Sequence, residues 1–287
     1  MNAEQFRHLR KTIDTDFGHI SYVEQGQGPV ALFVHGALLN GYQWRHQLTG
    51  LADIRRIIAP DSLGMGYTEM RTDAGLGMKQ QASMLRAFID ALDIEKVDVV
   101  GNNSGGGAVQ IFAANNPERI RTMTLTNCEV QDHDEEVPVR ANFRNLMKSG
   151  QIVELMQTLI DNPHGDRSGF TNAYQFPDAL PDDVFETYFA PLIQSPQRIK
   201  QMTDYIFTTT KNDHLEVEDK IKAIAAPTLV LWGLADQFFP VQWAHWLRDN
   251  LANVVEVMEI ADAKLFWPEE KPELLNQKLR EFWQRFS

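Results

Sequence analysis

The chain has 287 residues, of which 43% are hydrophobic, a length that suits one α/β domain carrying an insertion. Its formal net charge of −12, with no run rich in Lys or Arg, argues against nucleic acid and anionic membranes as partners, because both require a basic protein surface. A single cysteine, Cys128, excludes an intrachain disulfide bond and a cysteine-based zinc site. The N-terminal residues are polar and no apolar run reaches the length of a membrane span, so we expect a soluble cytoplasmic protein.

Strand and helix signals alternate over the first half of the chain. Runs that are apolar on both faces suit parallel strands covered by helices on either side. A helical spacing of apolar residues separates the third run from the fourth. The runs that predict strands are residues 20–24, 30–34, 56–61, 97–100 and 123–126.

A helical block interrupts this alternation from residue 129 to about 211. Strand signals return at residues 227–233 and 254–260, and the chain closes with an amphipathic helix. A helical block inserted between strands of a parallel sheet forms a lid. We therefore predict a core of residues 1–128 and 216–287 with a helical cap of residues 129–215, inserted after the sixth of about eight strands.

Residues 98–107 are typical of a buried strand that enters a helix through a tight turn, the geometry of a nucleophile elbow. Gly101 and Gly105 lie two residues before and after Asn103, so the G-x-nucleophile-x-G frame places an amide, a poor nucleophile, at the turn. A shifted frame would make Ser104 the nucleophile, but Asn102 would then crowd the turn. A phosphate-binding loop is disfavoured because neither glycine pattern of such loops is present.

Three features follow one another along the chain: His35-Gly36, the elbow at Asn103, and Asp236 after a strand. This layout resembles the α/β-hydrolase superfamily from about residue 20 to the C-terminus. Residues 35–45, residues 61–68 and the elbow are similar to the haloalkane dehalogenase and epoxide hydrolase branch, which normally carries Asp at the elbow. The resemblance implies a doubly wound, mostly parallel sheet of eight strands with a helical cap.

The resemblance also assigns roles to individual residues. The backbone N–H groups of Ala37 and Ser104 would form the oxyanion hole. Asp236, or alternatively Glu129 after the preceding strand, would be the acid that orients a catalytic His. A dehalogenase would carry Asn at position 37 and Trp at position 104 to hold the halide, so Ala37 and Ser104 weaken the case for dehalogenation.

The position of the catalytic His falls on Leu265, within residues 262–270. We expect Leu265 and Trp267 to line the pocket. A carboxylate nucleophile attacks without a base, but the ester that it forms needs a base for hydrolysis. A chain with Asn103 and Leu265 would therefore lack both the attacking group and the imidazole.

Two other histidines are alternative bases. His35 is more often a structural part of the His-Gly turn, and His133 lies in an acidic stretch that could equally be a solvated loop. One His with flanking acids is common on surfaces, so we expect no metal site. Aromatic residues of the cap suggest packing first and an apolar pocket wall second. These aromatic residues are Phe170, Tyr174, Phe176, Phe185, Tyr188 and Phe189.

We favour a hydrolase-like enzyme that acts on a small, largely apolar substrate and uses no cofactor. A homodimer is one assembly that we consider. The first alternative is non-covalent lyase, cyclase or isomerase chemistry, in which the oxyanion hole stabilises an enolate or alkoxide and Asn103 only donates or accepts hydrogen bonds. The second is a pseudoenzyme that binds a ligand under the lid.

Overall fold

The computed structural model describes residues 1–130 and 137–286. The candidate base His133 lies outside the described residues. Within them, the strands are β1 (Lys11–Thr15), β2 (Gly18–Gln25), β3 (Val30–Val34), β4 (Arg56–Pro60), β5 (Glu69–Met70), β6 (Val97–Asn103), β7 (Ile120–Cys128), β8 (Thr228–Gly233) and β9 (Val254–Ile260).

The helices flank the sheet and fill the interval between β7 and β8. Short 3-10 helices occupy Gly41–Trp44, Pro117–Arg119, Ser168–Phe170 and Pro177–Ala179. The α-helices are α1 (Ala3–Leu9), α2 (Arg45–Gly50), α3 (Met78–Ala91), α4 (Ser104–Asn115), α5 (Pro138–Ser149), α6 (Gln151–Asp161), α7 (Val184–Ile193), α8 (Pro196–Thr208), α9 (Asn212–Leu215), α10 (Glu218–Lys222), α11 (Gln242–Asn250), α12 (Trp267–Glu270) and α13 (Pro272–Arg285).

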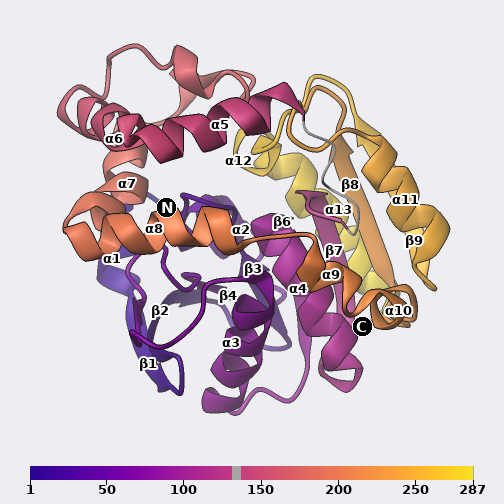
Figure 1. The fold of residues 1–287 in the computed structure, drawn as a ribbon. Helices are drawn as coiled ribbons and strands as arrows, with labels where there is room; N and C mark the ends of the chain where they lie inside the picture. The colour runs from indigo at the N-terminus through magenta and orange to yellow at the C-terminus, as the bar shows by residue number, and fades with distance from the viewer. Residues whose placement is uncertain (131–136, 287) are drawn as a thin grey trace.

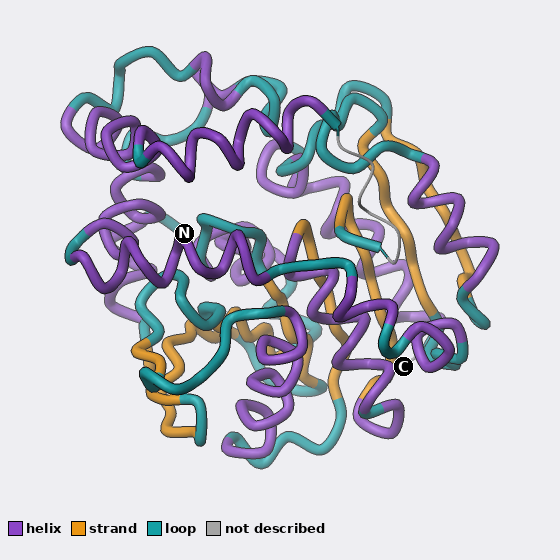
Figure 2. Tube along the Cα trace, in the orientation of Figure 1, coloured by secondary structure: helices purple, strands orange, loops and turns teal. Residues whose placement is uncertain are grey.

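The described strands form one nine-stranded sheet in the order β1-β2-β4-β3-β6-β7-β8-β9, with β5 paired to β2. The pairings of β2 with β1, β4 and β5 are antiparallel, whereas every pairing from β4 through β3 to β9 is parallel. This mostly parallel sheet with helices around it, visible in Figures 1 and 2, is the α/β-hydrolase fold that we expected.

The central strands are buried, and their apolar side chains project from both faces of the sheet. Every residue of β3 and β6 is buried. Phe33 of β3 packs its ring against Trp44 and against Trp283 of α13. Tyr22 of β2 packs against Phe88 of α3. Aromatic pairs of this kind add to the free energy of burial and fix where each helix sits on the sheet.

The chain between β7 and β8 carries helices and no strand in its described part. Figure 1 shows α5 and α6 at the top of the view, with α7 and α8 below them on the left. The strand β7 is the sixth strand along the main path of the sheet and the seventh strand in chain order. The boundaries of the cap at residues 129 and 215 stay a prediction.

A buried charge network joins α7 and Tyr174 to Arg45 and α12. The Glu269 carboxylate in α12 accepts hydrogen bonds from the hydroxyl of Tyr174 at 2.6 Å and that of Tyr188 in α7 at 2.7 Å. The same carboxylate forms an ion pair with Arg45, and both charged side chains are almost fully buried. Because a buried charge is tolerated only when it is paired and hydrogen-bonded, this network ties α7 to the core.

We find no helix in residues 1–130 and 137–286 that combines the length and the apolar character needed to cross a membrane.

Candidate active site

The elbow forms where β6 ends at Asn103 and α4 begins at Ser104. Asn103 has φ 54° and ψ −134°, a conformation that residues with a Cβ rarely adopt. The glycines of the frame make the turn possible: a Cβ on Gly105 would lie 2.3 Å from the carbonyl oxygen of Val34. Asn103 is therefore the residue at the apex. The alternative frame with Ser104 at the apex is wrong, because Ser104 is the first residue of the helix.

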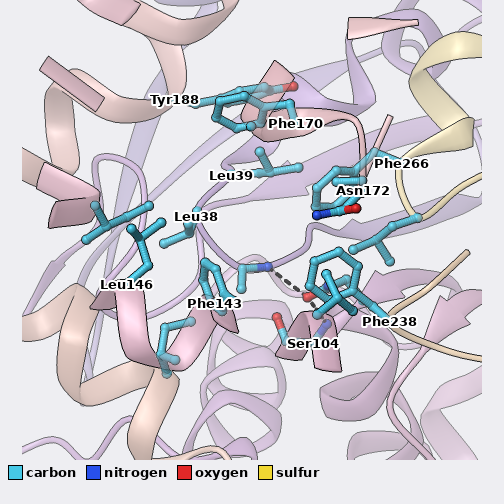
Figure 3. Close-up of a pocket in the computed structure, with 18 of the residues that line it drawn as sticks. Leu38, Leu39, Ser104, Phe143, Leu146, Phe170, Asn172, Tyr188, Phe238 and Phe266 are labelled. Atoms are coloured by element: carbon cyan, nitrogen blue, oxygen red, sulfur yellow. Dashed lines mark hydrogen bonds between the residues drawn. The ribbon is translucent and has the colours of Figure 1, made fainter. Parts of the chain in front are cut away.

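Two backbone N–H groups converge on the side chain of Asn103. Its Oδ1 accepts a hydrogen bond from Ala37 N–H at 3.1 Å and from Ser104 N–H at 2.6 Å. Dashed lines mark hydrogen bonds at this point in Figure 3. These are the two donors expected to form an oxyanion hole, and the oxygen that they hold belongs to residue 103 itself. The Nδ2 group of Asn103 then takes the place in which a carboxylate would carry its second oxygen.

Asn102 holds three segments of the site together. Its Nδ2 donates to the carbonyl oxygens of Thr126 and Leu265, both at 3.0 Å. Its Oδ1 accepts from Gln43 Nε2 at 2.7 Å, and Gln43 Oε1 accepts from Gly36 N–H at 2.9 Å. The sequence drew attention to Asn102 only as a steric obstacle. Its role depends on contacts between segments far apart in the chain, which no local pattern reveals.

Asn103 faces a cavity of about 360 Å³ whose lining includes residues of α5, α6, α7 and α8. Figure 3 shows Phe143, Phe238 and Phe266 near Ser104, with Phe170 and Tyr188 farther along the wall. The cap aromatic residues therefore both pack and line the cavity, except Phe176, which is 61% exposed. The lining residues that carry the argument are Ala37, Asn103, Ser104, Glu129, Tyr205 and Leu265.

Glu129 lies one residue beyond β7 and lines this cavity. It is 5% exposed, and its Oε2 has no hydrogen-bond partner among the described residues. Burial raises the pKa of Glu129 to about 7, although the positive charge of Arg140 opposes the rise. Glu129 thus brings into the cavity a carboxyl group that changes charge near neutral pH.

Asp236 has the burial expected of a catalytic acid but other partners. Its Oδ2 accepts a hydrogen bond from Asn127 Nδ2 at 2.8 Å, and its Oδ1 accepts from Phe238 N–H at 2.8 Å. Burial raises the pKa of Asp236 to about 7, and these hydrogen bonds limit the rise. The amide of Asn127 is thus the side-chain partner of Asp236. Asp236 does not line the cavity.

Leu265 is 2% exposed and lines the cavity. The expectation for Trp267 is wrong: its side chain is fully buried, and its Nε1 donates to Asn127 Oδ1 at 3.1 Å instead of facing the cavity. Trp267 therefore helps to hold Asn127 against Asp236.

His35 does not serve as the alternative base. Its Nδ1 donates to the carbonyl oxygen of Gly36 at 2.8 Å, and its Nε2 accepts from Ser62 N–H at 2.9 Å. Both ring nitrogens are occupied, and burial lowers the pKa of His35, so the neutral ring is the stable form. His35 is a structural part of the turn and lies outside the lining of the cavity.

Residues 29–272 match the family model described as alpha/beta hydrolase fold. The chain therefore belongs to the α/β-hydrolase fold family. It is 28% identical over 237 residues to the 2-hydroxymuconate semialdehyde hydrolase of Pseudomonas sp. (strain CF600), covering 80% of this chain and 78% of that protein.

Two further similarities lie closer to the resemblance that the motifs suggested. The chain is 31% identical over 114 residues to haloalkane dehalogenase 2 of Mycobacterium bovis (strain ATCC BAA-935 / AF2122/97), covering 40% of each protein. The structure of epoxide hydrolase CorEH without ligand superposes with a TM-score of 0.80 at 19% identity, covering 97% of this chain and 99% of the other. The latter similarity establishes the fold alone.

Proposed function

We propose that this protein is an enzyme of the hydrolase type that acts on a small, largely apolar electrophile under the helical cap. Its site follows the plan of the Asp-nucleophile branch, with Asn103 at the attacking position. The observation that carries the proposal is the placement of Asn103 Oδ1 between the N–H groups of Ala37 and Ser104, facing the cavity.

This placement favours a mechanism with a carboxylate nucleophile (a carboxylate plan) over one with a serine nucleophile (a serine plan). In an enzyme that transfers an acyl group from substrate to serine, the oxyanion hole must be empty to receive the substrate oxygen. In a carboxylate plan, one oxygen of the nucleophile occupies the hole, and the other attacks. When water later adds to the ester, the oxygen in the hole becomes the oxyanion. Residue 103 occupies the hole in the way that the carboxylate plan requires.

The same placement weighs against the non-covalent alternative, since an enolate or alkoxide would first have to displace Asn103 Oδ1 from both donors. The substrate class follows from the lining, which is mainly aromatic and aliphatic. The names of two similar proteins, a haloalkane dehalogenase and an epoxide hydrolase, supply suitable probes. We choose 1-bromohexane, 1,2-epoxyhexane, 4-nitrophenyl butanoate and β-butyrolactone, which present four kinds of electrophile to one cavity.

The test is Asn103→Asp, which returns an ionised carboxylate to a position whose donors are already in place. Each probe is incubated with the variant, the reaction is stopped with acid, and the mass of the intact protein is measured. We expect a covalent adduct with at least one probe. The matched control is Asn103→Leu, which keeps the side-chain size, cannot attack and should form no adduct.

An absence of adduct and of new activity with all four probes, together with turnover by the unmodified protein, would favour the non-covalent alternative. Ligand binding without turnover in either protein would favour the pseudoenzyme. A slow gain of about one mass unit in unmodified protein would indicate deamidation of Asn103 in its strained turn.

A further inference from the structure

We infer that Glu129 is the general base of this site, accepting the proton of a water molecule that reacts at the elbow in place of the imidazole absent at Leu265. The inference rests on the proposed function and assigns Glu129 a part different from that of an acid orienting a histidine.

The pairing of β6 with β7 places Glu129 beside the reacting position. Asn103 at the end of β6 is the register partner of Cys128 at the end of β7, and Glu129 is the next residue. Paired strands lie about 5 Å apart, so the backbone of Cys128 is adjacent to that of Asn103. Glu129 directly follows Cys128. The carbonyl oxygen of Glu129 accepts a hydrogen bond from Gln110 Nε2 at 2.7 Å, which fixes its backbone against α4.

The carboxylate of Glu129 has an unused oxygen in the cavity. A buried polar atom without a partner costs about 1–3 kcal/mol, so such atoms are rare and call for an explanation. Oε2 of Glu129 is such an atom within the described residues, and the side chain lines the same cavity as Asn103. Asp236 differs on both counts, because each of its oxygens accepts a hydrogen bond and it lies outside the cavity lining.

The charged and titratable groups around Glu129 are compatible with a base. Arg140 of α5 favours its charged form, and the negative charge of Glu129 reaches Cys128 and Tyr205 of α8. Burial raises the pKa values of Cys128 and Tyr205, so both stay protonated and neutral. A carboxyl group with a pKa of about 7 can accept a proton near neutral pH and release it afterwards.

An ester on residue 103 forms only in the Asn103→Asp variant, so the step is written for that variant. Glu129 takes a proton from water, and the water oxygen forms a bond to the carbonyl carbon of the ester. The carbonyl electron pair moves onto the oxygen held by the N–H groups of Ala37 and Ser104. Collapse of this intermediate breaks the bond to the alcohol oxygen, which leaves with the electron pair and takes the proton from Glu129. Residue 103 is left as a carboxylic acid, which releases its remaining proton to solvent and becomes a carboxylate again.

The principal experiment measures the lifetime of the ester. The Asn103→Asp variant is loaded with 1-bromohexane or 1,2-epoxyhexane, excess probe is removed, and the adduct is followed by intact-protein mass spectrometry. Adding Glu129→Gln should lengthen the lifetime about 100-fold or more, the usual contribution of general base catalysis. The decay rate should rise with pH through about 7 when Glu129 is present and lose that rise in the Glu129→Gln background.

The control adds Glu154→Gln to Asn103→Asp. Glu154 is an exposed residue of α6 outside the cavity lining, and the same Glu-to-Gln change there should leave the lifetime unchanged. Glu129→Gln should fold normally because it replaces a buried carboxyl, whose Oε2 has no hydrogen-bond partner among the described residues, by a neutral group of the same size. Equal ester lifetimes with Glu129 and with Gln at this position would overturn the inference.

A second measurement separates this inference from the proposed function. Unmodified protein is mixed with 5-nitrobenzisoxazole, in which removal of the ring C–H proton by a base breaks the N–O bond and releases a coloured cyanophenolate. This reaction needs only a base in an apolar cavity. If Asn103→Asp forms no ester, the proposed function fails, and this reaction decides on Glu129: at least a tenfold loss in Glu129→Gln supports the base, and an unchanged rate overturns it.

Discussion

Residue 105 sets how closely the elbow approaches β3. A Cβ at Gly105 would lie 2.3 Å from the carbonyl oxygen of Val34 and 2.5 Å from that of His35, and backbone atoms cannot move aside cheaply. We expect Gly105→Ala to lower the free energy of unfolding by roughly 3 kcal/mol or more, as severe overpacking does. Urea denaturation measures this loss.

The matched control is Gly169→Ala, where the nearest atom to the new Cβ is Leu155 Cδ2 at 3.8 Å. This substitution should change the free energy of unfolding by no more than about 0.5 kcal/mol. Equal stability of the two variants would show that the elbow is not packed as described.

Glu129 gives a second prediction at this scale, for stability against pH. Its folded pKa of about 7 is higher than that of an unfolded glutamate, so the folded state binds more protons between about pH 4 and 7. The free energy of unfolding therefore falls as pH rises through this window, by roughly 2–3 kcal/mol from this group. Glu129→Gln should remove that fall and be the more stable protein at pH 8, as measured by urea denaturation at pH 5 and pH 8. Parallel pH dependence of the two proteins would contradict the burial of Glu129.

At the scale of single residues, the sequence predicts those features of the site that depend on neighbouring residues in the chain. The spacing of Gly101 and Gly105 predicts Asn103 at the apex, because the steric demand of the turn falls on nearby residues. The unused oxygen of Glu129 and the network of Asn102 depend on which strands pair and what covers them. The position of Trp267 behind Asn127 likewise depends on how distant segments pack. The prediction that Trp267 lines the pocket used only its place in the sequence motif and is wrong for that reason.

At the scale of elements, a buried ion pair between Arg45 and Glu269 contributes to the connection between α7 and the core. Glu269→Gln would leave Arg45 buried without its counter-charge, so we expect a loss of roughly 3–5 kcal/mol in the free energy of unfolding. Tyr188→Phe removes one hydrogen bond to the same carboxylate and should cost about 1.5–3 kcal/mol. Hydrogen exchange should be faster in α7 of both variants than in the unmodified protein.

The surface pair of Lys200 and Asp204 on α8 provides the control. Both side chains are largely exposed, so Lys200→Met should cause no measurable loss of stability. A Glu269→Gln variant as stable as this control would mean that the network does not hold the cap.

The sequence predicts those strands that are buried on both faces of the sheet. The strand β3 is apolar on both faces, and a continuous apolar run identifies it; β6 is also buried throughout and is recognisable from its valines, although it contains Asp98. The strand β1 escaped prediction because it is a mainly exposed edge strand, and β5 because it has only two residues. Neither carries an apolar run, and both form through pairing with β2.

At the scale of the whole molecule, the site combines segments that are distant in the chain, and this allows a rescue experiment. Leu265 follows β9 and lines the same cavity as Asn103. Adding Leu265→His to Asn103→Asp/Glu129→Gln should restore a base and shorten the ester lifetime at least tenfold, as measured by intact-protein mass spectrometry. A matched Leu265→Asn variant should leave the ester long-lived, since it adds a polar group that cannot accept a proton near neutral pH. Equal lifetimes in these two variants would mean that position 265 cannot serve the reacting carbon.

The central claim is that the site retains the plan of a carboxylate nucleophile around Asn103. The most direct measurement is acid-quenched mass spectrometry of the Asn103→Asp variant after exposure to 1-bromohexane, 1,2-epoxyhexane, 4-nitrophenyl butanoate and β-butyrolactone, followed by peptide mapping. The predicted result is an adduct with at least one probe, located on residue 103 and absent from Asn103→Leu. A folded Asn103→Asp protein that stays unmodified with all four probes, or carries its adduct elsewhere, would contradict the claim.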